Sequence, residues 1–136
     1  MRKLSILFLS VFILFFVVSG CKNEENETQN VTAIYGTWYW KQSRGGINGK
    51  EIITPQGTGV DKKLVFNTNK KLTVFTNEVE TGNYTYTITK GNSIFDDKKH
   101  YLLTFNDMAY VIQSLDNTNL SIQDNFADGY VLTYTK

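Results

Sequence analysis

The chain has 136 residues, with 14 Lys and Arg against 13 Asp and Glu and a formal net charge of +1 at pH 7. Because the lysines are scattered, in pairs at most, the composition gives no electrostatic footprint for nucleic acid and argues against a nucleic-acid partner. Cys21 is the only cysteine and His100 the only histidine, which excludes an internal disulfide and leaves too few ligands for a zinc site. We expect no metal and no cofactor.

Residues 1–20 have the composition of a secretory signal peptide. Arg2 and Lys3 form a charged start, an almost wholly apolar run covers residues 4–18, and small residues follow. The apolar run is shorter than the ~20 residues that a membrane-spanning helix needs. We therefore expect this segment to be removed rather than to remain as a membrane span.

The tetrapeptide Val18-Ser19-Gly20-Cys21 resembles the lipobox of bacterial lipoproteins. The resemblance implies that Cys21 becomes the N-terminus after cleavage, carries fatty acyl chains such as palmitate, and attaches the protein to a membrane. Lys22 stands where an Asp often marks retention in the inner membrane, so the outer membrane is the expected location.

Residues 21–33, which include the acylated cysteine, are polar and acidic without apolar periodicity, and this predicts a flexible tether. The acidic cluster at Glu24, Glu25 and Glu27 is similar to the export signal that sends some lipoproteins to the cell surface. It is equally typical of a solvated linker. The sequence therefore favours the outer membrane and leaves its periplasmic and cell-surface faces as alternatives.

The folded part is predicted to begin at Gly36-Thr37-Trp38-Tyr39-Trp40. This aromatic and β-branched run is typical of a strand, and alternation places Trp38 and Trp40 together on one face. The Gly-Thr-Trp triplet resembles the Gly-x-Trp signature of the first strand of lipocalin-type barrels. That resemblance, which covers residues 34–136, implies that Trp38 plugs the closed end of a barrel and that Gly36 admits the ring.

In lipocalins a basic residue on the last strand often covers this Trp, and Lys136, the final residue, is the candidate here. The chain carries no counterpart of the other lipocalin motifs.

The remaining segments are short, apolar-alternating and separated by turn residues. Strands are expected at 38–43, 51–53, 62–66, 71–76, 84–89, 101–105, 108–112, 120–122 and 130–135. Loops are expected at 55–61 and 90–99, and tight turns at Asn48-Gly49 and Asn106-Asp107. Consecutive hairpins favour an all-β fold, an antiparallel up-and-down meander. We expect it to close into a lipocalin-like barrel of about eight strands, because closure removes exposed edges.

The sequence offers little for catalysis. His100 follows the charged run 96–99, which is typical of a solvated surface loop. No Gly-x-Ser-x-Gly elbow is present, and a single His leaves few choices of general base. We therefore expect a protein that is not an enzyme.

The aromatic side chains are the more informative set. The candidates to face a ligand lie on strand faces that otherwise carry Leu, Ile or Phe; they are Trp40, Phe66, Tyr84, Tyr86, Tyr101, Tyr110 and Tyr130. Since a buried Tyr hydroxyl needs a partner, an inward set predicts either a pocket for a small hydrophobic or amphipathic molecule or rings that fill a narrow barrel.

Two functions follow from these patterns. The first is a membrane-anchored, lipocalin-like lipoprotein that binds a small apolar or amphipathic molecule without catalysis. The alternative is a protein-interaction or accessory module at the cell envelope, with a filled barrel and no ligand. Its partner would contact the loops at 55–61 and 90–99, since binding residues concentrate in loops.

Overall fold

The computed structural model describes residues 30–136. The predicted signal peptide, Cys21 and the tether up to residue 29 lie outside the described residues. Within residues 30–136, no helix has the length and apolar character required to cross a membrane.

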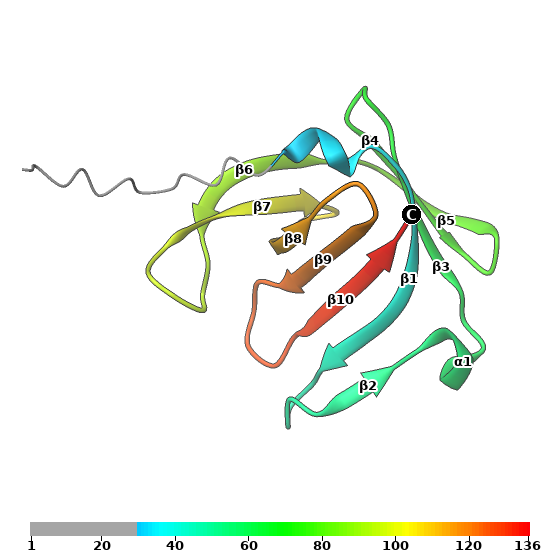
Figure 1. The fold of residues 1–136 in the computed structure, drawn as a ribbon, viewed down its shortest axis with the longest axis horizontal. Coiled ribbons are helices and arrows are strands. Elements are labelled where there is room, and N and C mark those ends of the chain that lie inside the picture. Colours follow the sequence, from blue (N-terminus) through cyan, green and yellow to red (C-terminus); the bar gives the residue numbers. More distant parts are fainter. Residues whose placement is uncertain (1–29) are drawn as a thin grey trace, which may run out of the picture.

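The described part of the chain forms one curled antiparallel sheet with two short helical turns (Figure 1). The elements are η1 (Val31–Ile34), β1 (Gly36–Gly45), β2 (Glu51–Ile53), α1 (Pro55–Thr58), β3 (Lys62–Phe66), β4 (Lys71–Thr76), β5 (Val79–Thr85), β6 (Thr87–Asn92), β7 (Lys99–Phe105), β8 (Met108–Leu115), β9 (Asn119–Asp124) and β10 (Tyr130–Thr135). The strand order is β5-β4-β3-β1-β10-β9-β8-β7-β6, with β2 also paired to β1. The predicted all-β antiparallel meander is confirmed, as a half-barrel curl.

The folded part begins before residue 34, where the sequence predicted the barrel domain to start. Residues 31–33, predicted as the end of the flexible tether, belong to the 3-10 turn η1, and Ala33 and Ile34 are buried. Asn30 caps this turn, because its side-chain oxygen accepts from the N–H of Thr32 at 3.2 Å. A four-residue turn is too short to produce apolar periodicity, so the sequence pattern did not predict it.

β1 lies inside the sheet, with β10 on one side and two short strands, β3 and β2, on the other. Its N-terminal half pairs with β3, from Gly36↔Phe66 to Tyr39↔Lys63. Its C-terminal half pairs with β2, from Ser43↔Ile53 to Gly45↔Glu51. The turn α1 separates β2 from β3 in the chain. β2 and β3 therefore occupy consecutive positions along the same side of β1.

The two terminal strands of the sheet, β5 and β6, follow each other in the chain and are separated only by Tyr86. The sequence predicted one strand over 84–89 because the alternation there is uninterrupted. The structure divides it, since β5 pairs with β4 and β6 pairs with β7. The N–H of Tyr86 donates to the carbonyl of Lys70 at 3.0 Å. Closure into a barrel of about eight strands remains a prediction.

The inner face of the curl carries the core. The buried apolar cluster consists of Ile34, Trp38, Trp40, Leu64, Phe66, Leu72, Tyr86, Leu103, Ile112, Leu120, Ile122 and Tyr134. The indole N–H of Trp38 donates to the carbonyl of Ile34 at 2.6 Å, so the largest buried ring is also tied to η1. This bond satisfies a buried donor that would otherwise destabilise the core.

Candidate functional site

One end of the inner face is organised around Trp38. The ammonium of Lys136 lies 4.6 Å from the centroid of the Trp38 ring and donates to the carbonyl of Ala33 at 2.8 Å. Gly36 has φ 117°, and a Cβ there would lie 3.3 Å from Cε of Lys136. Gly36 therefore supplies both a backbone conformation that other residues rarely adopt and room for the lysine stem.

Two of the predicted ligand-facing residues, Phe66 and Tyr86, lie within the packed core. Their rings meet edge to face with centroids 5.0 Å apart. The hydroxyl of Tyr86 donates to the carbonyl of Asn67 at 3.3 Å. Burial, together with the nearby Tyr35, raises the pKa of Tyr86 to about 12. These two rings fill space at the core and present no free face.

A second group of rings is only half-buried and forms a row along the inner face. Tyr84 lies 5.9 Å from Phe105, and Phe105 stacks on Tyr110 with centroids 5.0 Å apart. Gly82 makes room for the row, since a Cβ at that position would collide with the ring of Tyr84. We call Tyr84, Phe105 and Tyr110 the aromatic row.

Tyr134 and the buried Asp124 adjoin the aromatic row. Burial, with contributions from Asp124 and Tyr84, raises the pKa of Tyr110. Burial likewise raises the pKa of Tyr134, with Tyr110 and Asp124 adding to the shift. A carboxylate oxygen of Asp124 accepts from the N–H of Tyr130 at 2.8 Å. The group therefore combines apolar rings with hydroxyl and carboxylate oxygens.

Phe105 and Tyr134 were not among the predicted ligand-facing residues. Alternation places Phe105 on the same strand face as Tyr101 and Leu103. Alternation alone does not show which strand faces lie opposite one another in the fold, so it could not bring Phe105 next to Tyr84 and Tyr110. Tyr101 itself lies apart from the row, with the ammonium of Lys90 5.2 Å from its ring centroid.

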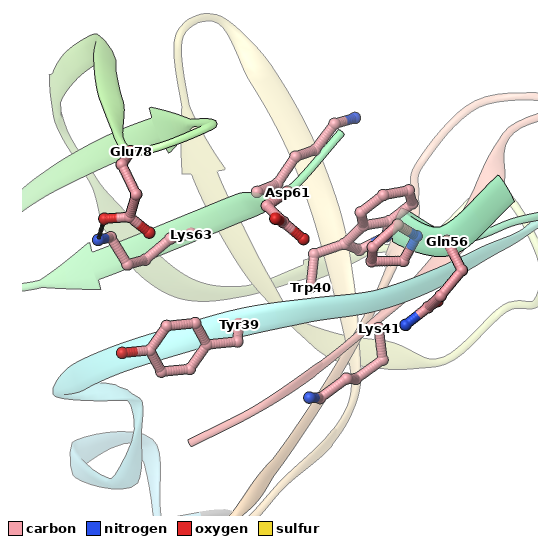
Figure 2. Close-up of a pocket in the computed structure, with 9 residues that line it drawn as sticks. Tyr39, Trp40, Lys41, Gln56, Asp61, Lys63 and Glu78 are labelled. Carbon is pink, nitrogen blue, oxygen red and sulfur yellow. Dashed lines mark hydrogen bonds and ion pairs between the residues drawn. The ribbon is translucent and has the colours of Figure 1, made fainter. Parts of the chain in front are cut away.

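Trp40 lines a pocket of about 320 Å³ beside β1 (Figure 2). Its lining residues come from β1, α1, the α1–β3 loop, β3 and the β4–β5 turn; they are Tyr39, Trp40, Lys41, Pro55, Gln56, Asp61, Lys62, Lys63 and Glu78. The indole N–H of Trp40 donates to the hydroxyl of Ser43 at 3.1 Å, and the ammonium of Lys62 lies 4.9 Å from its ring centroid. We call this site the Trp40 pocket.

Tyr130 lines a wider hollow of about 540 Å³ among loop residues, together with Gly46, Ile47, Asn48, Lys50, Glu51 and Asp128. Its hydroxyl donates to a carboxylate oxygen of Glu51 at 2.5 Å, and this bond raises the pKa of Tyr130. The seven predicted ligand-facing residues therefore do not form one site. Phe66 and Tyr86 lie in the core, Tyr84 and Tyr110 in the aromatic row, Trp40 and Tyr130 at two separate pockets, and Tyr101 apart from all of these.

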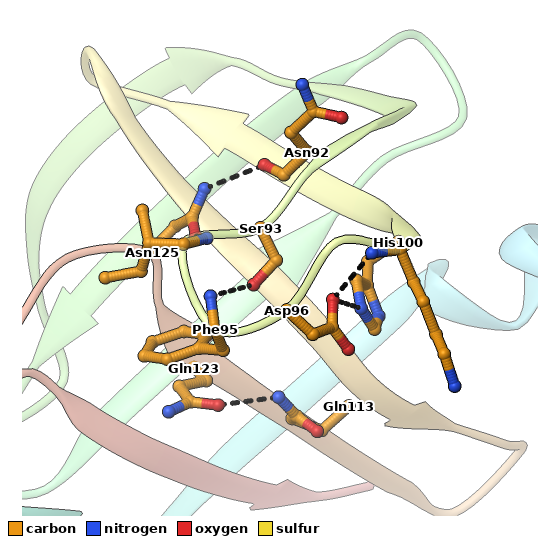
Figure 3. Close-up of polar contacts among 10 residues, drawn as sticks. Asn92, Ser93, Phe95, Asp96, His100, Gln113, Gln123 and Asn125 are labelled. Carbon is orange, nitrogen blue, oxygen red and sulfur yellow. Dashed lines mark hydrogen bonds and ion pairs between the residues drawn. The ribbon is translucent and has the colours of Figure 1, made fainter.

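The loop predicted at 90–99 is shorter than expected, because β6 extends to Asn92 and β7 begins at Lys99. A ring nitrogen of His100 lies 2.8 Å from a carboxylate oxygen of Asp96 (Figure 3), and this hydrogen bond lowers the pKa of Asp96. Across residues 30–136, no group of three or more His, Cys, Asp or Glu side chains is arranged to hold a metal ion.

The same figure shows that Asn125 connects two loops. Its side chain accepts from the N–H of Ile94 at 3.0 Å and donates to the carbonyl of Asn92 at 3.3 Å. The β6–β7 and β9–β10 loops are therefore held together, and both carry exposed apolar side chains, Ile94 and Phe95 on one and Phe126 on the other.

These observations define a small all-β protein built on a curled antiparallel sheet, with aromatic rings on its inner face and two surface pockets. No family model, no curated protein and no solved structure matches the chain.

Proposed function

We propose that the described domain is a lipocalin-like barrel that binds a small, partly apolar molecule without catalysis. Acyl chains on Cys21 would anchor it to the outer membrane. The observation that carries the proposal is the aromatic row of Tyr84, Phe105 and Tyr110, which stays half-buried while the neighbouring inner face is packed.

Barrel closure is supported by contacts between elements that are not paired. Tyr84 on β5 reaches Phe105 on β7, although β5 pairs only with β4. In such a barrel β5 and β6 would act as one strand that pairs with both β4 and β7, and β2 and β3 would act as one strand beside β1. The number of strands in the barrel is then about eight, the size of a small ligand-binding barrel.

The Trp38 end supports the same proposal. The buried Trp38, the glycine two residues before it and the lysine above its ring are the features that the lipocalin resemblance implies for the closed end. A ligand would then occupy the less completely packed part of the inner face, along the aromatic row.

The chemistry of the row indicates the ligand class. Aromatic rings offer flat apolar contact, while the hydroxyls of Tyr84 and Tyr110 offer hydrogen bonds near Asp124. Pockets of this kind bind molecules that are mostly apolar and carry a few well-placed polar groups. We therefore propose an amphipathic ligand with at least one hydrogen-bonding group.

Native mass spectrometry of the full chain, extracted gently from its native host, tests the proposal. We expect an adduct of one defined mass, which Tyr84→Phe and Tyr110→Phe reduce because each removes a hydroxyl from the row. Tyr130→Phe, at the loop hollow, should leave it unchanged. A protein mass without any adduct would count against the binding function.

The anchor is tested separately. Labelled palmitate should be incorporated into the wild-type protein and not into Cys21→Ser, which should also leave the membrane fraction. Incorporation that persists in the variant would show that Cys21 is not the lipid attachment site.

The alternative, a protein-interaction module, is favoured by one observation. Ile94, Phe95 and Phe126 are exposed on two loops that Asn125 holds together. Exposed apolar side chains grouped on ordered loops are typical of interaction sites. A defined envelope protein retained by wild type, and released by Phe95→Ser but not by Ile47→Ser, would support this function over ligand binding.

A further inference from the structure

The sheet has an opening on one side of β1. Tyr39↔Lys63 is the last pair between β1 and β3, and Ser43↔Ile53 is the first between β1 and β2. Residues 40–42 therefore have no strand partner on this side among the described residues. On the other side β10 continues past them, with a register shift between Trp40 and Gln42. The Trp40 pocket lies at this opening.

The helical turn α1 keeps the opening in place. The hydroxyl of Thr54 accepts from the N–H of Gly57 at 3.1 Å, and Pro55 stands at the start of the turn. Gly59 ends it in the left-handed region at φ 67°, with its N–H donating to the carbonyl of Pro55 at 2.8 Å. The chain thus encodes a complete capped turn between β2 and β3, so the opening is a built feature and not a frayed strand end.

The opposite rim is fixed as well. The N–H of Asp61 donates to the side-chain oxygen of Asn77, and the N–H of Asn77 donates to the carbonyl of Asp61, each at 2.8 Å. An ion pair between Lys63 and Glu78 joins β3 to the β4–β5 turn. Figure 2 shows this pair and Asp61 facing the pocket from the side opposite Gln56. Such fixed walls reduce the ordering cost that a ligand must overcome.

The charges that line the pocket favour an anion. Lys63 and Glu78 neutralise each other, whereas Lys41 and Lys62 form no ion pair within residues 30–136. Asp61 is the remaining carboxylate, so the lining keeps an excess of positive charge. The ring of Tyr39, which is 47% exposed, and the pyrrolidine of Pro55 supply apolar surface, whereas Trp40 is only 4% exposed and lies beneath the ammonium of Lys62.

We propose that the Trp40 pocket is a second binding site, for a small aromatic anion. The flat ring contacts Tyr39 and Pro55, and a carboxylate or sulfonate pairs with the ammonium of Lys62, with Lys41 adding positive potential. A volume of about 320 Å³ suits a ligand of one or two rings. This site is separate from the aromatic row and does not depend on the function proposed for that row.

Equilibrium dialysis of the full chain in mild detergent tests the site with two probes of the same ring system, naphthoate and the neutral naphthylmethanol. We expect saturable naphthoate binding, with a dissociation constant that rises about tenfold in Lys62→Gln because a charge-assisted contact is lost. Naphthylmethanol should bind wild type and Lys62→Gln equally. The same detergent surrounds every variant, so uptake by micelles cancels in the comparison.

Lys90→Gln is the matched control, because Lys90 also lies above an aromatic ring, that of Tyr101; its naphthoate affinity should equal that of wild type. Tyr84→Phe and Tyr110→Phe should also bind naphthoate normally. Equal affinity in wild type and Lys62→Gln, or no saturable binding, overturns the proposal. Loss of naphthoate binding in the tyrosine variants alone would place the probe on the aromatic row, which also overturns this site while leaving the proposed function standing.

Discussion

Lys136 and Trp38, near opposite ends of the described chain, are in direct contact. The lysine ammonium lies 4.6 Å from the indole centroid and donates to the carbonyl of Ala33, while the indole N–H donates to the carbonyl of Ile34. The N–H of Lys136 also donates to the carbonyl of Thr118 at 3.0 Å. The last residue, the first strand and η1 therefore stabilise one another.

Lys136→Met should lower the free energy of unfolding by about 1–2 kcal/mol. The substitution keeps the apolar stem but removes the ammonium, and with it one charge-assisted hydrogen bond and one cation–π contact. Urea denaturation measures the loss. Lys90→Met removes a cation from above Tyr101, where the ammonium lies 5.2 Å from the ring, and should cost less than about 1 kcal/mol. Equal losses would mean that the Ala33 bond contributes nothing.

Asp116 should make stability depend on pH at acid values. Its carboxylate accepts from the N–H groups of Thr118 and Asn119, each at 2.7 Å, and these bonds lower its pKa from 3.8 to about 2. Because the folded-state pKa is depressed, the contribution is present above pH 3.8 and is lost as pH falls toward 2. Asp116→Asn keeps an acceptor oxygen without the titration. Its urea midpoint should therefore change less than that of wild type between these pH values.

Tyr86 should make stability depend on pH at alkaline values. Burial raises its pKa from 10.0 to about 12, so the protonated form is favoured in the folded state. The contribution is complete below pH 10 and is lost as pH rises toward 12. Tyr86→Phe should remove this part of the alkaline decline and cost about 1 kcal/mol at neutral pH, because its bond to Asn67 is lost. Urea midpoints measured between neutral and alkaline pH give both effects, and an unchanged alkaline slope would contradict the assignment.

The sequence predicted the strand content well, because strand content rests on local patterns of alternation and turn residues. Alternation at 130–135 and the turn at Asn106-Asp107 correspond to observed features; both turn residues have positive φ, at 50° and 59°. The division at Tyr86 was not predicted, because alternation within one segment does not reveal that its pairing partner changes from β4 to β7.

The candidate site was predicted less well, because it depends on which faces meet. Trp40 lies on the core face, as alternation predicts, but the pocket beside it requires α1, within a segment expected to be a loop. Thr54, Pro55 and Gly59 carry the capping signals of this turn. The turn at Asn77 and Glu78 was missed as well. Its positive φ values of 48° and 64° are adopted without any glycine in the turn itself.

Gly45 should tolerate substitution far less well than Gly49. Gly45 lies at the last β1–β10 pair with φ 154°, and a Cβ there would collide with the carbonyl oxygen of Gly129 and lie 2.9 Å from Cα of Tyr130. Both are backbone atoms, so no side-chain rotation relieves the contact. Gly49 has φ 67° but nothing within 4 Å of its Cβ position. Thermal or urea unfolding should show a loss above about 3 kcal/mol for Gly45→Ala and about 1 kcal/mol for Gly49→Ala. A similar loss for both variants would mean that β1 and the β9–β10 loop do not approach as closely as the structure places them.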